Sequence, residues 1–508
     1  MLTLSEVITR NAKELGDKPS IIIPGSDAEL SYAELDHQVS RFAEYLRAIG
    51  CGRGSRILIA IHNTQAAFIV LIGAMRAGMV AIPVDSNLAT PELKTIVAHA
   101  RPAAIIVDDT SAPKLAVVPS ECMQIHVGSS PLPGLLMFDP SVKEERCSWE
   151  QPAVDVNDVA LILYTSGTTG LPKGVMHTHA GVAAKLATIQ EWFGFDASFR
   201  SLCLLPTHFG HGLICNCLTT LSYGGTLVLC RPFDLDLVQQ LWGLVEKYQV
   251  NTFSTVPAVV RLMLRFAERN APARAPSLKF VTCASAPLRP EDVETFEQRF
   301  GVLLLNCFGI TETASWTAFS PREANRDKSS VGIAFGCEIR AADEAGQGLP
   351  ANSEGELQVR GPSVMSGYYE NPELTAQSTP DGWFKTGDRG KVDEKGRVFI
   401  LGRIKELIIR AGLNIYPADV DAVMLSHPEV AEAYSVGVED KMLGEKVVAA
   451  AVLKEGSVLN EQDLLSYCRS HLAAYKCPER ICFVSAIPKT SRGKVNRANL
   501  RPLFLTSH

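Results

Sequence analysis

The stretch Tyr164-Thr-Ser-Gly-Thr-Thr-Gly-Leu-Pro-Lys-Gly174 is the most distinctive part of this sequence. The apolar segment 159–163 leads into it and predicts a strand, and we expect a helix to begin near Ala180. A run so rich in glycine costs backbone entropy without building a core, so a surface loop without a ligand is the weaker interpretation.

The residue types in this stretch suit a polyphosphate. Ser166, Thr168 and Thr169 offer hydroxyl and amide donors, and Lys173 offers a cation. The lysine follows Leu-Pro, and no Ser or Thr comes next, so the stretch is not a Walker A motif. We therefore predict a phosphate-binding loop of another kind.

Outward from this loop, short apolar runs alternate with amphipathic segments. Ser31 and Glu34 form a capping-box pattern before a helix that should end near Gly50. Strands are expected at 57–61, 80–84, 227–230, 251–255, 280–283 and 302–306, with helices at 65–78 and ending near 248, 269 and 300. This alternation predicts an α/β fold whose parallel sheets carry helices on both faces.

The pattern changes after about Val331. Segments 338–360 and 390–401 are broken by Gly, Pro, Asn and Asp and predict hairpins. From Lys405 onward a mixed stretch of about a hundred residues has the size of a separate domain. We therefore predict one domain over 1–404, a tight hinge, and a second domain over 405–508.

Composition excludes several classes of protein. With 508 residues, the chain is too long for one typical core, and its 46% hydrophobic and 20% charged residues are ordinary for a globular protein. A net charge of −6 argues against nucleic-acid binding. No secretory signal is evident, and the apolar run Ala66–Val84 is broken by Arg76 and Pro83, so no membrane span is expected. The 13 scattered cysteines favour reduced, buried thiols in the cytoplasm over a zinc site.

The glycine-rich loop resembles the phosphate-binding signature of the adenylate-forming superfamily, which joins acyl-CoA synthetases, peptide-synthetase adenylation domains and firefly luciferase. Further segments match this family in its order along nearly the whole chain: Ala284-Ser-Ala-Pro-Leu288, Phe308-Gly-Ile-Thr-Glu312, Phe384-Lys-Thr-Gly-Asp388, Gly402-Arg-Ile-Lys-Glu406 leading to Gly412-Leu-Asn-Ile-Tyr-Pro417, and Pro488-Lys-Thr-Ser-Arg-Gly-Lys494. The closest likeness is to acyl- or aryl-CoA synthetases. It implies a β-barrel-like subdomain after the helix-covered sheets and a mobile α+β C-terminal domain.

The resemblance also implies a role for each matched residue. ATP or AMP would contact Thr165, Ser166, Gly167, Thr169, Gly170, Lys173, Ala284, Ser285, Ala286, Phe308, Gly309, Thr311, Asp388 and Arg403. Mg²⁺ would be held by Glu312 and Thr168, which with Lys494 form the catalytic set, and Lys405 would be the hinge. For Asp388 an Asx turn before Gly390 is the lesser alternative.

Some positions depart from the family pattern. The family commonly has Gly where Ala284 or Ser285 stands, usually has Tyr at position 308, and has glutamates where Asp419 and Asp421 stand. Phe308 keeps a stacking face but loses a hydroxyl, so any role of that hydroxyl is in question.

The expected chemistry is attack of a carboxylate on the α-phosphate of ATP, with release of pyrophosphate. The protein must position the reactants and neutralise the developing charge, and it needs no covalent nucleophile. Glu312 is the natural carboxylate for Mg²⁺. Lys494 can bridge the carboxylate and the α-phosphate; a solvated surface lysine is the alternative.

The segment Pro206-Thr-His-Phe-Gly-His-Gly-Leu213 resembles the gate of the family's acyl pocket. Phe209 can form a wall but cannot act as an acid or base. His208 and His211 are balanced between a pocket role and a structural one. The resemblance places Trp316 on the pocket wall, which favours a short, medium or aromatic acid over a long fatty chain.

The acceptor is the remaining question. In the family the segment around Gly412 lines a pantetheine tunnel, and Lys476 and Arg480 could meet the phosphates of coenzyme A. A CoA ligase is the favoured interpretation. The alternatives are a free-standing enzyme that loads a carrier-protein phosphopantetheine and a nucleotide-binding protein without activity.

Overall fold

The computed structural model describes residues 1–26, 29–142, 153–166, 172–267, 276–323, 325–410, 413–440, 443–472, 474–489 and 495–505. The chain divides into two compact units. Unit 1 comprises Met1–Glu338 and Val359–Phe384, and unit 2 comprises Ile339–Gln358 and Lys385–His508. The division predicted between residues 404 and 405 separates a fixed domain from a mobile one. The two compact units do not show which residues move, so that division stays a prediction.

The first sheet of unit 1 is built around parallel strands, as the sequence predicted. Its order is β16-β15-β14-β13-β12-β10-β11-β1-β2, and β1, β11, β10, β12, β13 and β14 run parallel. The bounds are β1 Pro19–Ile22, β2 Glu29–Ser31, β10 Arg200–Cys203, β11 Thr226–Leu229, β12 Thr252–Thr255, β13 Phe280–Cys283, β14 Leu303–Ile310, β15 Ser315–Phe319 and β16 Gly332–Ala334. Strands β15 and β16 extend the sheet antiparallel from β14.

The second sheet of unit 1 has the order β19-β9-β8-β4-β3-β5-β6-β7. Its bounds are β3 Arg56–Ala60, β4 Val80–Pro83, β5 Ala104–Val107, β6 Met123–Val127, β7 Leu136–Phe138, β8 Val159–Ser166, β9 Pro172–Thr178 and β19 Gly367–Tyr368. Strands β8, β4, β3, β5, β6 and β7 run parallel, whereas β9 and β19 are antiparallel additions.

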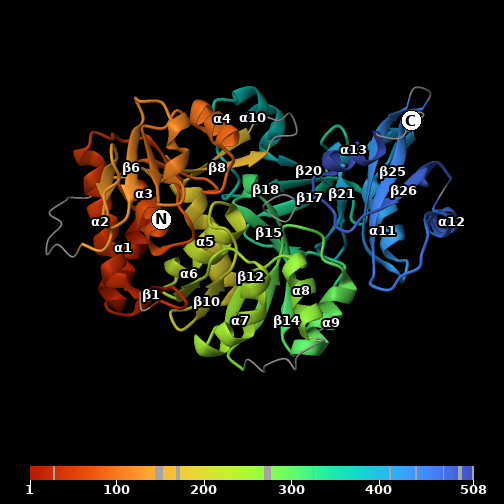
Figure 1. Ribbon diagram of the computed structural model, residues 1–508, viewed down its shortest axis with the longest axis horizontal. Coiled ribbons are helices and arrows are strands. Elements are labelled where there is room, and N and C mark those ends of the chain that lie inside the picture. Colours follow the sequence, from red (N-terminus) through yellow and green to blue (C-terminus); the bar gives the residue numbers. More distant parts are fainter. Residues whose placement is uncertain are drawn as a thin grey trace. The chain divides into compact units, whose positions relative to one another are not determined.

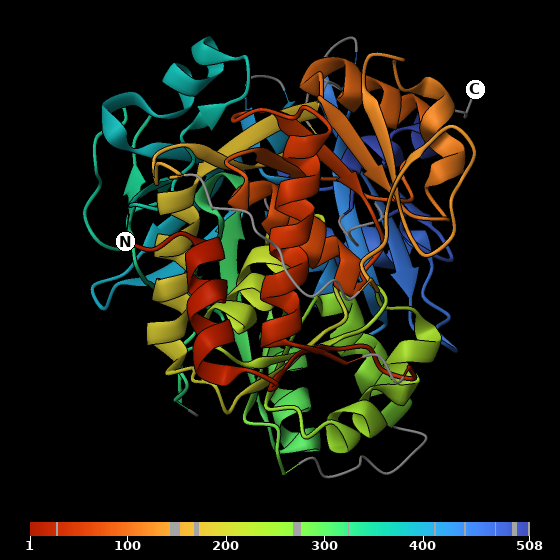
Figure 2. The ribbon, with the colours of Figure 1, turned by 90° about the vertical axis from the view of Figure 1, so that its left-hand side faces the viewer.

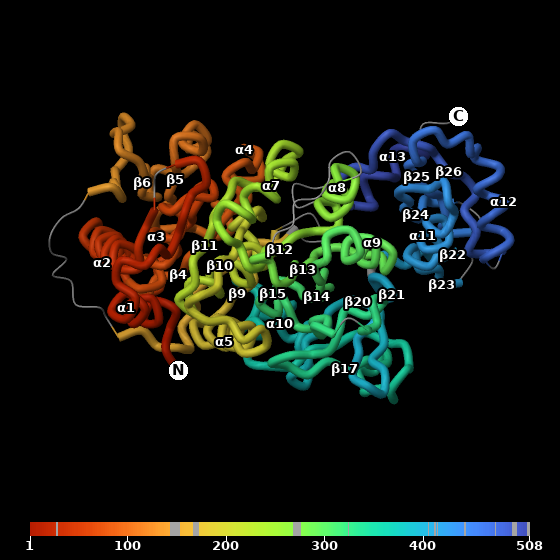
Figure 3. The backbone as a smooth tube through the Cα atoms, turned by 90° about the horizontal axis from the view of Figure 1, so that it is seen from below, coloured from red at the N-terminus to blue at the C-terminus, as the bar shows by residue number. Residues whose placement is uncertain are grey.

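Helices cover both sheets. Their bounds are α1 Leu4–Leu15, α2 Tyr32–Ala48, α3 Gln65–Arg76, α4 Thr90–Ala100, α5 His179–Phe193, α6 Thr219–Ser222, α7 Leu235–Lys247, α8 Pro257–Ala267, α9 Pro290–Phe300 and α10 Pro372–Ser378. In Figure 1, α7, α8 and α9 follow one another along the first sheet. Figure 2 shows α1 (red) beside α5 (yellow). Figure 3 shows α7 and α8 on one side of β10 and β12 and α5 on the other.

Local signals in the sequence account for several helix ends. Ser31 caps α2, and its hydroxyl and the Glu34 carboxylate form the expected capping box. Helix α3 is buried on nearly every side, which explains its apolar sequence, and its last residue, Arg76, bonds Ser5 and Asp36 of α1 and α2. No helix in the described ranges is long and apolar enough to cross a membrane.

Several strands were missed in the sequence analysis, among them β1, β5, β6, β10 and β15, and also β9 beside the glycine-rich loop. Strand β9 returns antiparallel beside β8 before α5 begins at His179, so the glycine-rich loop joins the two strands of a hairpin. The Pro-Lys-Gly start of β9 is poor in strand formers, and its pairing with β8 outweighs that preference.

Unit 2 is dominated by antiparallel strands. The hairpins expected at 338–360 and 390–401 are present, and their strands lie side by side in the order β17, β18, β20 and β21. Their bounds are β17 Glu338–Ala342, β18 Gly355–Arg360, β20 Phe384–Val392 and β21 Arg397–Arg403. The first residue of β17, the first residue of β20 and the last two residues of β18 belong to unit 1. The rest comprises β22 Ile408–Arg410, β23 Leu413–Ile415, α11 Pro417–Leu425, β24 Val430–Asp440, β25 Gly444–Leu453, α12 Glu461–His471, β26 Arg480–Phe483 and α13 Pro502–Leu505. The predicted α/β and α+β classes are confirmed.

Arg497 connects three parts of unit 2. Its guanidinium contacts Glu406 Oε2 at 2.7 Å, Asp421 Oδ2 at 2.6 Å and the carbonyl oxygen of Ser435 at 2.7 Å. Asp421 is buried, and its other oxygen accepts two hydrogen bonds from Ser435. Because an isolated buried carboxylate is costly, unit 2 depends on this arginine.

Replacing Arg497 with methionine should lower the free energy of unfolding of unit 2 by about 3–5 kcal/mol, because Asp421 would lose its buried counter-charge. Chemical denaturation followed by circular dichroism measures this change. Arg469→Met, on the exposed side of α12, is the matched control and should change stability by less than about 0.5 kcal/mol. Equal stability of the two variants would contradict the assigned role.

Candidate active site

The described ends of the glycine-rich loop are held by a regular hairpin. Thr165 pairs with Lys173, and Ser166 pairs with Pro172. Gly167, Thr168, Thr169 and Gly170 lie outside the described residues, as does the side chain of Ser166. Strand pairing therefore fixes where Lys173 leaves the loop, whatever path the loop itself takes.

A tyrosine joins the loop lysine to the predicted metal carboxylate. The Nζ atom of Lys173 lies 5.4 Å from the ring centroid of Tyr368, a cation–π distance. The hydroxyl of Tyr368 donates to Glu312 Oε1 at 2.9 Å. Burial, together with the charge of Glu312, raises the pKa of Tyr368 well above its usual value, so the phenol stays a donor at neutral pH.

Glu312 lies in a tight turn between β14 and β15. The turn is a short 3-10 segment, Thr311–Thr313, followed by Ala314 at φ 51° and Ser315 at φ 74°. Two further contacts hold it: the carbonyl oxygen of Thr311 accepts from His177 Nε2 at 2.9 Å, and that of Glu312 accepts from the Met365 amide at 2.8 Å. Burial lowers the pKa of His177 to about 4, which keeps its ring neutral.

The predicted adenine wall follows β13. Ser285 adopts φ 76°, a region that strains a residue with a Cβ atom. Its Oγ atom lies 3.1 Å from His211 Nδ1, a hydrogen bond that glycine could not make. This contact gives a physical reason for serine where the family commonly has glycine. Ala284 is buried and Ala286 is partly exposed beside it.

The predicted acyl-pocket residues form one chain of ring contacts. The rings of His208 and Phe209 lie 5.9 Å apart, those of Phe209 and His211 6.2 Å, and those of His211 and Trp316 5.4 Å. Trp316 is buried in β15. His211 begins a π-helical segment, His211–Leu218, a form of helix that is frequent at functional sites.

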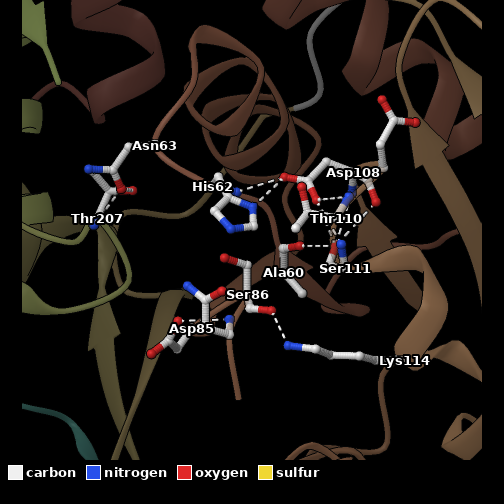
Figure 4. A network of polar contacts seen from close by, with 12 residues as sticks. Ala60, His62, Asn63, Asp85, Ser86, Asp108, Thr110, Ser111, Lys114 and Thr207 are labelled. Carbon is white, nitrogen blue, oxygen red and sulfur yellow. Dashed lines mark hydrogen bonds and ion pairs between the residues drawn. The ribbon is translucent and has the colours of Figure 1, made fainter. Parts of the chain in front are cut away.

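A polar network anchors the segment that carries these histidines (Figure 4). The amide and the hydroxyl of Thr207 donate to Asn63 Oδ1 at 3.1 and 2.9 Å. His208 Nε2 lies 3.9 Å from a carboxylate oxygen of Asp85. Asn63 and Asp85 follow β3 and β4, so the gate segment is positioned by the carboxyl ends of parallel strands, where α/β sheets commonly bind ligands.

Unit 2 pairs the two residues predicted to bind ribose. Arg403 Nε lies 2.7 Å from Asp388 Oδ1, and these residues face each other in the β20–β21 pair. The Asp388 amide donates to Thr386 Oγ1 at 3.0 Å, but this contact uses the main chain of Asp388 and does not test the Asx-turn alternative for its side chain. A ribose hydroxyl would have to share Asp388 with Arg403.

The other residues of unit 2 that were predicted to have a function form no hydrogen bond or ion pair with one another in the described part of the chain. Lys476 forms an ion pair with Asp419 at 2.9 Å, whereas Arg480 is exposed at the start of β26. The backbone of Lys405 lies in a 3-10 turn, Ile404–Glu406, but its side chain is outside the description. Gly412 and Lys494 also lie outside the described residues, so their roles stay predictions.

The residues near Glu312 fit a metal ion that binds together with the phosphate groups of a nucleotide. Within the part of the chain that the structure describes, no three His, Cys, Asp or Glu residues form a metal cluster. Mg²⁺ with nucleotides is usually held by one or two carboxylates plus phosphate and water oxygens, so Glu312 is compatible with the predicted Mg²⁺ site that it would share with Thr168.

Sequence reasoning missed Tyr368 and His177, whose side chains contact the Glu312 turn. His177 lies in the unrecognised strand β9, where its burial follows from the strand's alternation. The tyrosine pair after Gly367 was the available signal for Tyr368, because a buried tyrosine needs a hydrogen-bond partner.

The chain matches two family models in order. Residues 8–369 match the model described as AMP-binding enzyme, and residues 419–494 match the AMP-binding enzyme C-terminal domain. The chain belongs to the AMP-binding enzyme family. This membership confirms the predicted resemblance and the class of enzyme, an AMP-forming ligase.

Relatives of this family member are similar along its whole length. It is 31% identical to the probable CoA ligase CCL9 of Humulus lupulus, over 99% of this chain and 97% of that protein. It is 30% identical to the sulfoacetate–CoA ligase of Cupriavidus necator, over 98% and 97%. The crystal structure of ATP-bound MatB from Rhodopseudomonas palustris matches with a TM-score of 0.88 at 28% identity, covering 99% of each chain.

Replacing Tyr368 with phenylalanine should raise the Mg²⁺ concentration needed for half-maximal adenylation by about tenfold, because a hydrogen bond to a charged group contributes about 1.5 kcal/mol. The ring beside Lys173 is kept. Titration of Mg²⁺ in an acid-dependent ATP–pyrophosphate exchange assay measures the shift.

Tyr369→Phe is the matched control, because that hydroxyl contacts the exposed Glu370. It should shift the Mg²⁺ requirement less than about twofold, the range of an exposed contact. The same shift in both variants would show that Tyr368 does not orient Glu312.

Proposed function

We propose that the protein activates a carboxylic acid with ATP, forming an acyl-adenylate and pyrophosphate, and then transfers the acyl group to the thiol of CoA. The observation that carries this proposal is the arrangement of Glu312, Tyr368 and Lys173 at the end of the glycine-rich loop. It combines a carboxylate for Mg²⁺ with a cation for phosphate oxygens. Membership of the AMP-binding enzyme family supports the same reaction.

Adenylation requires the charge on the phosphates to be offset while the acid approaches. Lys173 supplies one fixed positive charge, and Glu312 with the Thr168 hydroxyl would hold Mg²⁺, which offsets further phosphate charge when bound. Phe308, Gly309 and the 284–286 segment would flank the adenine, and Asp388 and Arg403 would bind the ribose. Lys494 would bridge the attacking carboxylate and the α-phosphate.

The acid would lie against Trp316 and His211, with Phe209 as a wall. The buried indole in this group supports a short, medium or aromatic acid. Curated relatives of the chain are CoA ligases, one of them named for sulfoacetate, which supports CoA as acceptor. Lys476 and Arg480 would meet CoA phosphates, Gly412 would line the pantetheine path, and rotation at Lys405 would separate the two half-reactions.

The principal alternative is transfer to a carrier-protein phosphopantetheine. Thioester formation with CoA alone supports the proposal, whereas activity only with a pantetheinylated carrier supports the alternative. A protein without activity would show no acid-dependent ATP–pyrophosphate exchange. The buried free cysteines support a cytoplasmic location, which is part of the proposal.

Replacing Lys494 with alanine should lower the rate of acyl-adenylate formation by about 100-fold or more, because a charge that acts in the transition state is removed. Conversion of supplied acyl-adenylate to thioester should persist. ATP–pyrophosphate exchange measures the first half-reaction, and thioester formation from synthetic adenylate measures the second.

Lys489→Ala is the control, because Lys489 belongs to the same segment but forms an ion pair with Glu432. Both half-reactions should be nearly normal in this variant. Adenylation at the normal rate in Lys494→Ala would refute the assignment of this lysine.

A further inference from the structure

Helix α5 carries a buried lysine that the mechanism above does not use. Lys185 is 1% exposed, and its ammonium donates to the carbonyl oxygen of Trp316. The ring centroid of Phe335 lies 5.3 Å from the Nζ atom. Among the described residues, no carboxylate forms an ion pair with Lys185.

This arrangement differs from that of the other buried cations in the described residues. Arg76 contacts Asp36 at 2.6 Å, and Arg326 contacts Glu297 at 2.5 Å. Burial lowers the pKa of Lys185, with only the thiols of Cys337 and Cys215 acting in the opposite direction. A cation kept in such surroundings is costly unless an anion offsets its charge.

Lys185 is linked to the predicted acyl pocket through the main chain of Trp316. The residue that accepts its hydrogen bond, Trp316, makes an edge-to-face ring contact with His211, whose Nδ1 atom lies at hydrogen-bond distance from the Ser285 hydroxyl. The indole Nε1 of Trp316 is also buried, and no described residue accepts a hydrogen bond from it. Trp316, the residue expected to bound the acid, therefore carries one buried donor on its indole and accepts a hydrogen bond from a second, the Lys185 ammonium.

We infer that Lys185 selects acids that carry a second anionic group, a carboxylate or a sulfonate, and that its ammonium pairs with that group. The inference rests on the proposed function and names its class of substrate. An ammonium has three donors, of which the Trp316 carbonyl uses one, so Lys185 can keep that contact while binding an oxyanion. The first carboxylate of the acid then remains available for the α-phosphate.

A panel of isosteric acid pairs tests this selection through ATP–pyrophosphate exchange. Each pair compares an anionic group with an alkyl group of the same shape: sulfoacetate with 3,3-dimethylbutanoate, succinate with 4-methylpentanoate, and terephthalate with 4-isopropylbenzoate. In at least one pair the wild-type kcat/KM should favour the dianionic acid by at least about 10-fold. A preference for the alkyl acid in every pair would overturn the inference.

Lys185→Met keeps the length of the side chain and removes its charge. It should lower kcat/KM for the preferred dianionic acid by at least about 100-fold and change that for the alkyl partner less than about threefold. Lys279→Met is the control, because Lys279 also contacts an aromatic ring, that of Phe199, but is exposed; it should leave the ratio unchanged.

An equal loss for both acids in Lys185→Met would show a structural role and refute the inference. If that variant does not fold, the wild-type ranking alone decides. If only the alkyl acids support ATP–pyrophosphate exchange, the inference is refuted and the proposed function stands. If no acid supports ATP–pyrophosphate exchange, the proposed function itself is refuted.

Discussion

The close approach of two backbones in the β14–β15 hairpin is the constraint on which the site of unit 1 depends. A Cβ atom at Gly309 would lie 1.9 Å from the carbonyl oxygen of Ser315, so only glycine lets the strands meet there. The turn between them presents Glu312, and the pairing sets Trp316 opposite Gly309. One steric requirement therefore positions both the carboxylate expected to hold Mg²⁺ and the indole expected to bound the acid.

Much of the fold follows from the sequence because its strands and helices have separate, regular patterns. The capping box at Ser31, the start of α5 and seven strands of the two sheets are where the sequence predicts them; these strands are β3, β4, β8, β11, β12, β13 and β14. Strand β9 was not predicted, because its stability comes from pairing with β8 and β19 and not from its own residues. Tyr368 was missed for the same reason: its partner, Glu312, is distant in sequence.

Departures from the family pattern have local explanations that need coordinates. Ser285 accepts a strained backbone and bonds His211, and Asp421 forms a buried pair with Arg497. At Phe308, where the family usually has tyrosine, the main-chain carbonyl oxygen accepts a hydrogen bond from the Thr317 hydroxyl at 3.3 Å. The sequence shows which residue differs at each position, but the compensating contact comes from another strand or helix. The class of acid that we infer could not be predicted from the sequence either, because the sequence does not show that Lys185 is buried and bonded to the main chain of Trp316.

The central claim is that the carboxylate of an acid attacks the α-phosphate of ATP, and isotope transfer tests it most directly. The enzyme is incubated with Mg·ATP, CoA and an accepted acid labelled with ¹⁸O in its carboxylate, and the products are examined by mass spectrometry. Attack at the α-phosphate predicts AMP that carries one ¹⁸O atom, together with unlabelled pyrophosphate and an acyl-CoA thioester. Release of ADP with the label in inorganic phosphate would contradict the account.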